Sequence, residues 1–144
     1  MPEQQTYENH VRWYPLVHFF LFPLLILNFL YQAVRLYQEP SADRAVFTLL
    51  SFAFIGMVLA ARTQALRAQD RVIRLEEKVR YKELVPAELA SRASNLSAGQ
   101  VIALRFAADE EVSELLRRAC DNEFATTKEI KQAIKNWRGD YHRV

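Results

Sequence analysis

The chain has 144 residues, a net charge of +2 and a single cysteine, so it offers neither a strong field for polyanions nor a thiol pair for an internal disulfide. Its hydrophobic fraction of 51% and charged fraction of 25% would suit a soluble domain, but the two classes are segregated along the chain. Charges are sparse from residue 14 to residue 61 and dense from residue 62 onward. This segregation argues against a soluble globular protein and predicts one membrane-embedded part and one soluble part.

The first apolar run follows a polar N-terminal segment, residues 1–13, and predicts a membrane span over about residues 14–34. About 21 helical residues at about 1.5 Å each cover about 31 Å, which matches the hydrocarbon core of a bilayer. Pro15 falls in the first turn, where its missing N–H costs nothing, and Pro23 is expected to kink the helix. We do not expect a cleaved signal peptide, because the preceding segment is not basic and the run is too long.

Three polar side chains in this span allow two interpretations. Asn28 and Gln32 lie one helical turn apart, and we favour hydrogen bonds across a helix pair, worth roughly 0.6 kcal/mol each. His18 is the candidate for a cofactor site, since a histidine in a span can ligate haem or the magnesium of a pigment. Against that site, the second span contains no histidine, and neither span contains an internal carboxylate for a proton relay.

A second span is predicted over about residues 45–61, at the short end of the range for a membrane helix. The segment between the spans, residues 35–44, allows only a tight hairpin, and Ser41 is the expected cap of the second helix. Small residues on one face of this helix permit close packing on the first span or on a partner. They are Ala53, Gly56 and Ala60.

Lysine and arginine residues decide the predicted orientation. The hairpin loop has two, Arg35 and Arg44, whereas the stretch after the second span has six: Arg62, Arg67, Arg71, Arg74, Lys78 and Arg80. The positive-inside rule therefore places both termini in the cytoplasm. Four of these residues are predicted to contact anionic lipid headgroups, at about 1 kcal/mol each near the surface: Arg62, Arg67, Arg71 and Arg74.

The second helix is expected to continue beyond the membrane, because no glycine, proline or turn cluster interrupts residues 62–84. Together with the span it would form a rod of about 40 residues, roughly 60 Å long. An apolar stripe at alternating spacings of three and four follows this stalk: Ala65, Ala68, Val72, Leu75 and Val79. The stripe is under three heptads long, so we favour packing on the C-terminal helices of the same chain over a coiled-coil dimer.

Residues 85–144 predict a small cytoplasmic domain of three or four short helices that leans on the stalk for burial. Ser97 and Gln100 form a predicted capping box, and Thr126 with Glu129 another, opening a helix that ends at Gly139. The domain contains none of the common nucleotide-binding, zinc-binding or metalloprotease motifs. We interpret the acidic residues 109–114 as a solvated charge cluster and Cys120 as a small buried hydrophobe.

The last predicted helix is basic and carries aromatic residues. Its candidate contact residues for a partner or an anionic membrane surface are Lys131, Lys135, Trp137 and Arg138. Nucleic-acid binding would use such a face as well, but it is the less favoured partner, because an acid interrupts the basic run. An ordinary helix whose apolar side joins the core is the favoured interpretation.

Three stretches carry a family resemblance: "ENHVRWYPLVHFF", "ARTQALRAQDRVIRLEE" and "KEIKQAIKNWRGDYHRV". They resemble a family of small bacterial two-span membrane proteins described only as a domain of unknown function. The resemblance covers nearly the whole chain. It implies a bacterial membrane protein and supplies no catalytic residues. With both termini in the cytoplasm, the predicted location is the inner membrane.

The sequence therefore predicts an all-α fold: a transmembrane hairpin over residues 14–61, a helical stalk over residues 62–84 and a cytoplasmic helical domain over residues 85–144. The leading hypothesis is a non-enzymatic accessory subunit or scaffold, without cofactor or metal, that contacts membrane lipids and packs on itself or on a larger membrane complex. Two alternatives stay open. One is a haem or pigment site at His18, and the other is a membrane-anchored regulator that binds anionic lipid or nucleic acid through its basic helices.

Overall fold

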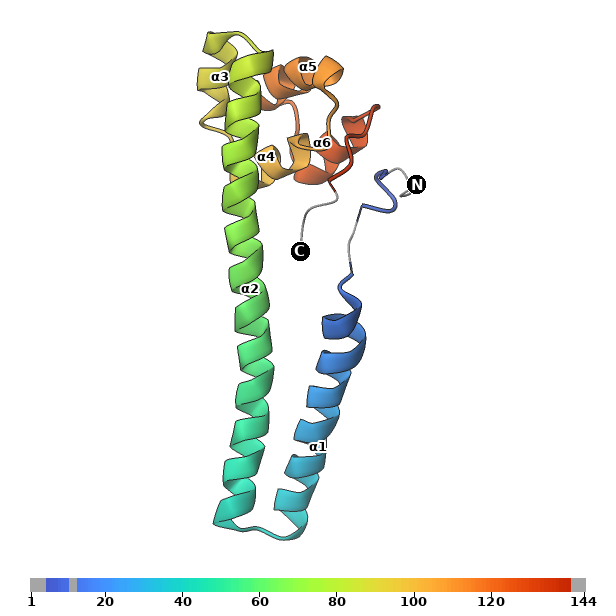
Figure 1. The fold of residues 1–144 in the computed structure, drawn as a ribbon, viewed down its shortest axis with the longest axis vertical. Coiled ribbons are helices and arrows are strands. Elements are labelled where there is room, and N and C mark those ends of the chain that lie inside the picture. The colour runs from blue at the N-terminus through green and yellow to red at the C-terminus, as the bar shows by residue number, and fades with distance from the viewer. Residues whose placement is uncertain (1–4, 11–12, 141–144) are drawn as a thin grey trace. The chain divides into compact units, whose positions relative to one another are not determined.

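The computed structural model describes residues 5–10 and 13–140. Most of these residues are helical, with no β-strand among them, and the predicted all-α class is confirmed. The elements follow in the order η1, a π-helix (Leu16–Leu21), α1 (Phe22–Gln38), α2 (Ala42–Leu84), α3 (Ala87–Ala93), α4 (Ala98–Leu104), α5 (Asp109–Cys120) and α6 (Thr127–Ala133) (Figure 1). Parts of the predicted N-terminal segment and of the last domain, residues 1–4, 11–12 and 141–144, lie outside the described residues.

The described residues divide into two compact units. The hairpin unit comprises residues 13–66, and the helical domain comprises residues 67–140 together with residues 5–10. As predicted, the second helix is not interrupted after the span, and α2 ends at Leu84. Pro86 comes two residues later and has no N–H with which to continue the helix.

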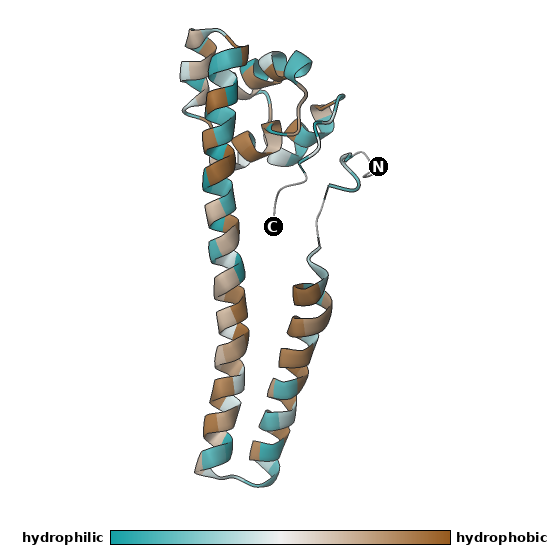
Figure 2. Ribbon diagram, viewed as in Figure 1, coloured by the Kyte–Doolittle hydropathy of each residue, from teal (hydrophilic) through white to brown (hydrophobic). Residues whose placement is uncertain are grey.

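By length and composition, two helices could cross a membrane: Leu16–Gln38 and the apolar part of α2. Figure 2 shows the apolar residues gathered along α1 and along the half of α2 that follows the loop. None of the most apolar stretch of the first helix is buried, and only 6% of that of the second. Exposed apolar surface of this extent is typical of proteins that meet lipid or a partner.

The helix before Pro23 is irregular. Leu16–Leu21 is wound as a π-helix, and the N–H of Phe22 donates to the carbonyl oxygen of Val17, five residues earlier. Pro23 has no N–H for the regular bond to the carbonyl of Phe19, and a π-helical turn is one way to absorb the mismatch. The kink predicted at Pro23 stays a prediction.

Arg44 holds the hairpin loop together. Its Nη1 donates to the carbonyl oxygens of Arg35, at 3.2 Å, and of Glu39, at 2.7 Å, and its guanidinium pairs with the Glu39 carboxylate. The hydrogen bond from Arg44 lowers the pKa of Glu39, and the charges of Arg44 and Arg35 act in the same direction. Ser41 caps α2 as predicted, because its Oγ accepts the N–H of Arg44 at 3.3 Å.

The helical domain encloses one apolar core, whose largest fully buried side chains are Leu104, Phe106, Val112, Leu116 and Ile130. The predicted capping box at Ser97 and Gln100 is present. The backbone N–H of Gln100 donates to Ser97 Oγ at 3.3 Å, and the backbone N–H of Ser97 donates to Gln100 Oε1 at 2.9 Å. Thr126 likewise caps α6 through the N–H of Glu129.

The face of α2 that joins this core differs from the predicted one. The apolar stripe was expected to pack on the C-terminal helices, but Val72, Leu75 and Val79 are 52%, 65% and 57% exposed. The buried residues on this part of α2 are instead Ile73, Glu77, Arg80 and Tyr81. The prediction was wrong because two of these residues are charged, so an apolar pattern could not reveal the buried face.

The guanidinium of Arg80 connects α2 to the start of α5. Its Nε and Nη2 donate to Asp109 Oδ1 at 2.8 and 2.6 Å, and its Nη2 also donates to the carbonyl oxygen of Ala107 at 2.7 Å. Its Nη1 lies 3.1 Å from Glu77 Oε2, and Arg138 lies 3.6 Å from the other oxygen of that carboxylate. Burial raises the pKa of Glu77 despite these two positive neighbours.

The end of α6 differs from the prediction. The helix ends at Ala133, well before the predicted end at Gly139. The carboxylate of Glu111, on α5, accepts the backbone N–H groups of Lys135 and Asn136 at 3.1 and 3.0 Å. In a continuing helix these groups would bond to carbonyls of α6 itself. The local pattern gave no sign of a competing acceptor 24 residues away.

After α6 the chain returns along the turn that follows α4. The N–H of Ala108 donates to the carbonyl of Asn136 at 3.0 Å, and the N–H of Arg138 donates to the carbonyl of Phe106 at 2.7 Å. The ring of Trp137 packs at 5.0 Å from that of Phe106. Trp137 therefore joins the core from an extended segment and not from a helix.

The described N-terminal residues belong to the same domain. Gln5 exchanges two hydrogen bonds with the backbone of Asp140, at 3.2 and 2.9 Å. The ring of His10 lies 5.8 Å from that of Phe106 and 5.7 Å from that of Trp137. The segments that precede α1 and follow α6 are thus held together.

Replacing Arg80 by methionine should lower the free energy of unfolding of the helical domain by about 3–5 kcal/mol, because Glu77 would be left buried without its main partner. Lys78→Met, on the exposed side of the same helix, should change it by about 0.5 kcal/mol or less. Denaturant unfolding in detergent, followed by Trp137 fluorescence in a Trp13→Phe background, measures both. Equal losses in the two variants would contradict the role given to Arg80.

Candidate functional site

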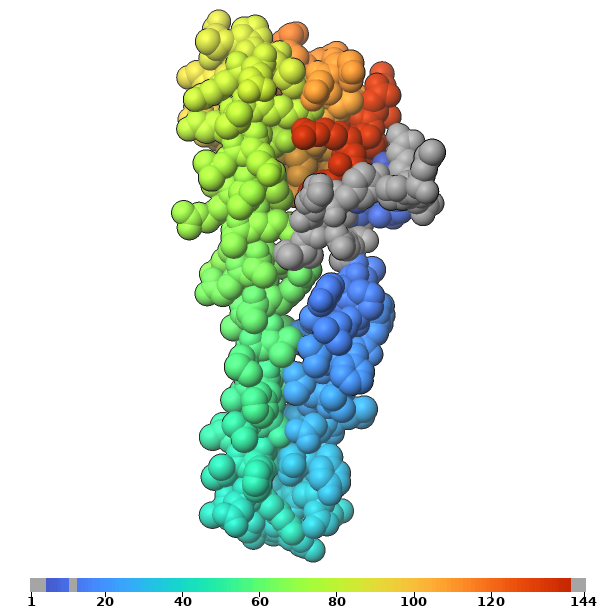
Figure 3. Space-filling view, in the orientation of Figure 1, coloured from blue at the N-terminus to red at the C-terminus, as the bar shows by residue number. Residues whose placement is uncertain are grey.

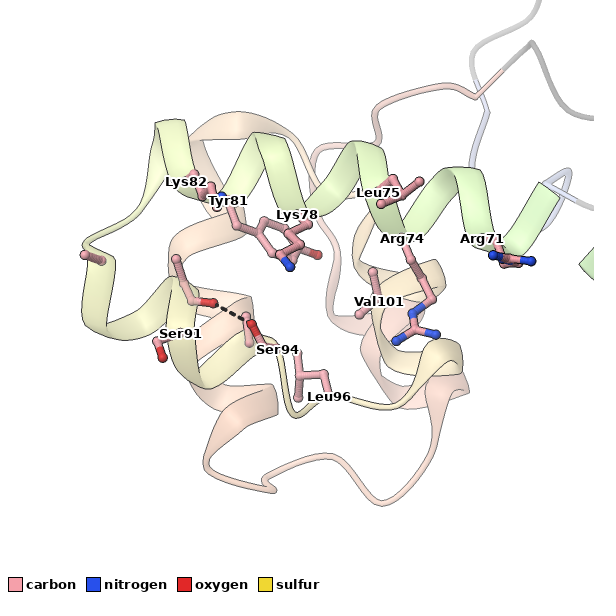
Figure 4. Close-up of a pocket in the computed structure, with 13 residues that line it drawn as sticks. Arg71, Arg74, Leu75, Lys78, Tyr81, Lys82, Ser91, Ser94, Leu96 and Val101 are labelled. Carbon is pink, nitrogen blue, oxygen red and sulfur yellow. Dashed lines mark hydrogen bonds between the residues drawn. The ribbon is translucent and has the colours of Figure 1, made fainter. Parts of the chain in front are cut away.

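A pocket of about 590 Å³ opens between α2 and α3 of the helical domain (Figure 4). One wall carries four cations of α2: Arg71, Arg74, Lys78 and Lys82. Their spacings of three and four residues place them on one side of the helix. The described residues that line the pocket include no acid, so the positive charges are not balanced within the lining.

The opposite wall of the pocket consists of small and apolar side chains. α3 contributes alanines and serines, and the turn and helix beyond it contribute Leu96 and Val101. Ser94 Oγ is directed to the carbonyl oxygen of Ala90, at 3.5 Å, within α3 (dashed in Figure 4). Small side chains on α3 leave the space that defines the pocket. A cationic rim over an apolar floor suits a ligand that combines an anionic group with an apolar body.

The pocket brings together two of the four arginines predicted to contact headgroups. Arg71 and Arg74 line it, whereas Arg62 is half-buried in the hairpin unit and Arg67 is exposed outside the lining. Lys78 was predicted only to help set the orientation, and Lys82 was not among the predicted contact residues. Residues 78 and 82 continue the spacing of three and four residues from Arg71 and Arg74, and this spacing could have predicted that they share a helix face.

Tyr81 closes the inner end of the pocket and is buried. Burial raises the pKa of its phenol, and the Glu77 carboxylate beside it acts in the same direction. The phenol therefore stays neutral at physiological pH. In Figure 4, Tyr81, Lys78 and Arg74 point toward the α3 side of the pocket, whereas Leu75 points away from it.

In the hairpin unit, Asn28 makes the kind of contact that was predicted for it. Its Nδ2 donates to Ser51 Oγ on α2 at 2.9 Å, and Ser51 Oγ donates to the carbonyl of Phe47 at 2.8 Å. The rings of Phe29 and Phe52 meet beside this bond, with centroids 5.9 Å apart. Gln32, one turn further along α1, is half-buried.

The small-residue face of α2 is open within the chain. Ala53, Gly56 and Ala60 are exposed, and a Cβ built on Gly56 would meet no atom within 4 Å. Packing of this face on a partner stays a prediction.

His18 lies in η1 and contacts its own helix. Its Nδ1 lies 2.9 Å from the carbonyl oxygen of Tyr14 and 3.2 Å from the Tyr14 nitrogen. Its ring lies 5.1 Å from that of Trp13, edge to face. Haem or pigment ligation by His18 stays a prediction.

Most of the predicted contact residues at the C-terminal end are engaged inside the domain. Lys131 is half-buried, with its Nζ 3.0 Å from His10 Nε2 and 5.7 Å above the Phe106 ring. Trp137 belongs to the core margin, and Arg138 pairs with Glu77. Lys135 has an exposed side chain. These four residues therefore do not form one continuous basic surface.

Two further predicted features concern reactive groups. Among residues 5–10 and 13–140, no three His, Cys, Asp or Glu side chains come together in a way that could hold a metal ion. Cys120 is half-buried beside the core, and burial raises the pKa of its thiol. A thiol of raised pKa is a poor nucleophile at neutral pH.

Comparison with known proteins places the chain in a family. The model of the family described as "Family of unknown function (DUF6526)" matches residues 1–144. No curated protein matches the chain, and no solved structure matches it.

The Asn28–Ser51 hydrogen bond should contribute about 0.6 kcal/mol to the stability of the hairpin. Asn28→Ala and Ser51→Ala should each destabilise it, and the double variant should lose less than the sum of the two. Unfolding in mixed detergent micelles measures all four proteins of this cycle. Strict additivity would show that the two side chains do not interact.

Proposed function

The chain belongs to this family of unknown function, and we propose that it is a two-span protein of the bacterial inner membrane that serves as a non-enzymatic accessory subunit or scaffold. The hairpin unit would span the lipid, and the helical domain would lie on the cytoplasmic side. The resemblance of the sequence to small bacterial membrane proteins supports a bacterial membrane, and the predicted cytoplasmic termini support the inner one.

One observation carries the two-span topology. Residues before the first candidate span and residues after the second belong to one folded domain, because Gln5 bonds to Asp140 and His10 packs on Trp137. If the apolar helices cross a bilayer, these segments must then lie on the same side of it. An even number of crossings satisfies this condition, and the part of the chain that the structure describes offers two candidate helices.

The cytoplasmic side is supported by charge. The loop cations Arg35 and Arg44 both pair with Glu39, whereas α2 beyond the second span carries an excess of arginine and lysine. Such an excess is held on the cytoplasmic side during insertion. The role as a subunit is supported by the open small-residue face, which permits close approach of another helix.

Single cysteines in a Cys120→Ser background test this topology. In intact spheroplasts, a membrane-impermeant maleimide should label Tyr37→Cys, near the loop, and should label Glu110→Cys, on α5, only after the cells are opened. Tyr37 and Glu110 are both exposed, so burial does not limit labelling at either position. The labelling therefore reports on which side of the membrane each residue lies. Reversed labelling, or a chain that stays in the soluble fraction, would contradict the proposal.

The subunit role has its own readout. After extraction in mild detergent, the protein should migrate as an assembly of more than one chain on a native gel. A single chain without any co-purifying partner would refute the scaffold role while leaving the topology intact.

A second candidate function rests on the pocket between α2 and α3. Four cations over an apolar floor favour a regulator that binds an anionic amphiphile, such as a phospholipid headgroup with part of its chains. The contact is charge-assisted and should weaken with salt.

Binding of short-chain phosphatidic acid to the full chain in zwitterionic nanodiscs tests this candidate. Arg74→Gln with Lys82→Gln should weaken binding about tenfold or more, since each lost charge-assisted contact costs roughly 1.5–3 kcal/mol before screening. Arg117→Gln with Lys128→Gln removes the same charge from exposed sites outside the pocket and should have little effect. Equal weakening would indicate general charge attraction, and equal binding of inorganic phosphate would show that the apolar floor has no role.

A further inference from the structure

An exposed apolar stripe runs along the part of α2 that carries the helical domain. Val72, Leu75 and Val79 each keep more than half of their surface exposed, and Ala65 and Ala68 continue the stripe toward the hairpin. The residues that join the core lie on the other side of α2, because Leu75 and Glu77 are about 200° apart around a helix with 3.6 residues per turn. Packing of the domain therefore leaves the stripe uncovered.

We propose that this stripe pairs with the same stripe of a second copy, as a parallel two-stranded coiled coil over about residues 64–83. The inference deepens the proposed function, on which it rests, by naming the partner of the scaffold as another copy of this chain.

The composition of the stripe favours two strands. In heptad register the first core position holds Ala65, Val72 and Val79, and the second holds Ala68, Leu75 and Lys82. β-Branched residues at the first position with leucine at the second favour parallel dimers over higher oligomers. Lys82 closes the seam, where its aliphatic stem can cover apolar surface while its amine reaches water.

The charges that flank the stripe fix its direction. The residues before the first core position are Gln64, Arg71 and Lys78, and those after the second are Gln69, Glu76 and Glu83. In a parallel dimer each residue of the first set meets the residue of the second set that lies five positions later on the other copy. Arg71 then meets Glu76 and Lys78 meets Glu83, while Gln64 meets Gln69. In an antiparallel dimer cations would face cations and acids would face acids.

A parallel arrangement is also the one that membrane insertion imposes. Two copies inserted with the same topology have their α2 helices in the same direction. A seam of under three heptads is too short to pair strongly between free chains in water. Anchoring in one membrane raises the effective concentration of the two stalks, so that a weak seam can still pair.

Disulfide trapping in native membranes tests the dimer. In the full chain with Cys120→Ser, Leu75→Cys lies in the seam and Arg74→Cys is an exposed control at the adjacent position. Under mild oxidation Leu75→Cys should form a dimer about tenfold faster, because only seam positions bring the two Cβ atoms within disulfide reach. Val72→Cys gives a second seam position in case Leu75→Cys does not accumulate. Equal trapping at residues 74 and 75, or none at either seam position, would overturn the dimer.

Charge reversal identifies the partner as a second copy. Arg71→Glu with Lys78→Glu should reduce trapping through Leu75→Cys several-fold, and so should Glu76→Arg with Glu83→Lys. All four substitutions together should restore it, because the pairs are re-formed with exchanged signs. A stripe covered by lipid or by another protein would give no such restoration, which would refute the proposal.

The labelling of Tyr37→Cys and Glu110→Cys in the same membranes separates a failure of the dimer from a failure of the membrane topology. Labelling as expected, without dimer trapping, overturns the coiled coil alone. Reversed labelling overturns the membrane topology. The parallel dimer is then overturned as well, because it rests on that topology.

Discussion

The helical domain depends on the buried guanidinium of Arg80. This group reaches Asp109, the carbonyl of Ala107 and Glu77 at once, and it thereby fixes which side of α2 faces α5. Burying a charge is strongly destabilising unless partners compensate it. Rotating α2 would move Arg80 away from its partners, so the network allows little rotation. The rest follows from that orientation. With Glu77 and Arg80 inward, the Val72–Leu75–Val79 stripe faces outward, and the cations at residues 71, 74, 78 and 82 face α3. Figure 3 shows α2 and the short helices of the helical domain in a space-filling view.

Local sequence signals predicted the elements well where local interactions decide them. The uninterrupted run to Leu84 gave the end of α2, and Ser97 with Gln100 gave the start of α4, because each depends on residues within one turn. The same reasoning failed where a distant side chain intervenes. Glu111 draws the backbone of Lys135 out of the helix, and Arg80 with Asp109 overrides the apolar pattern of the stalk. An apolar period identifies a face that avoids water, but it does not identify what covers that face.

The candidate pocket shows the same division. Charge and position along the chain pointed to Arg71 and Arg74, since a basic stretch after a span is a local feature. The cavity beside them depends on the small side chains of α3 and on the packing of α3 against α5, which bring Leu96 and Val101 opposite α2. No local pattern states that alanines and serines of one helix will face the cations of another. Cations of the site could therefore be predicted from the sequence, but the shape of the pocket could not.

The pocket and the exposed stripe draw on shared residues, and this couples the two proposals. Arg71 and Lys78 line the pocket, and in the coiled coil the same two cations pair with Glu76 and Glu83 of a second copy. An anion that requires all four cations would bind separate stalks better than paired ones, and by linkage it would weaken pairing by the same factor. An anion held by Arg74 alone would leave pairing unaffected, because Arg74 is the one cation of the four that takes no part in the seam. The sign of this coupling thus depends on which cations the ligand uses, and that is decided by how deeply its anionic group enters between α2 and α3.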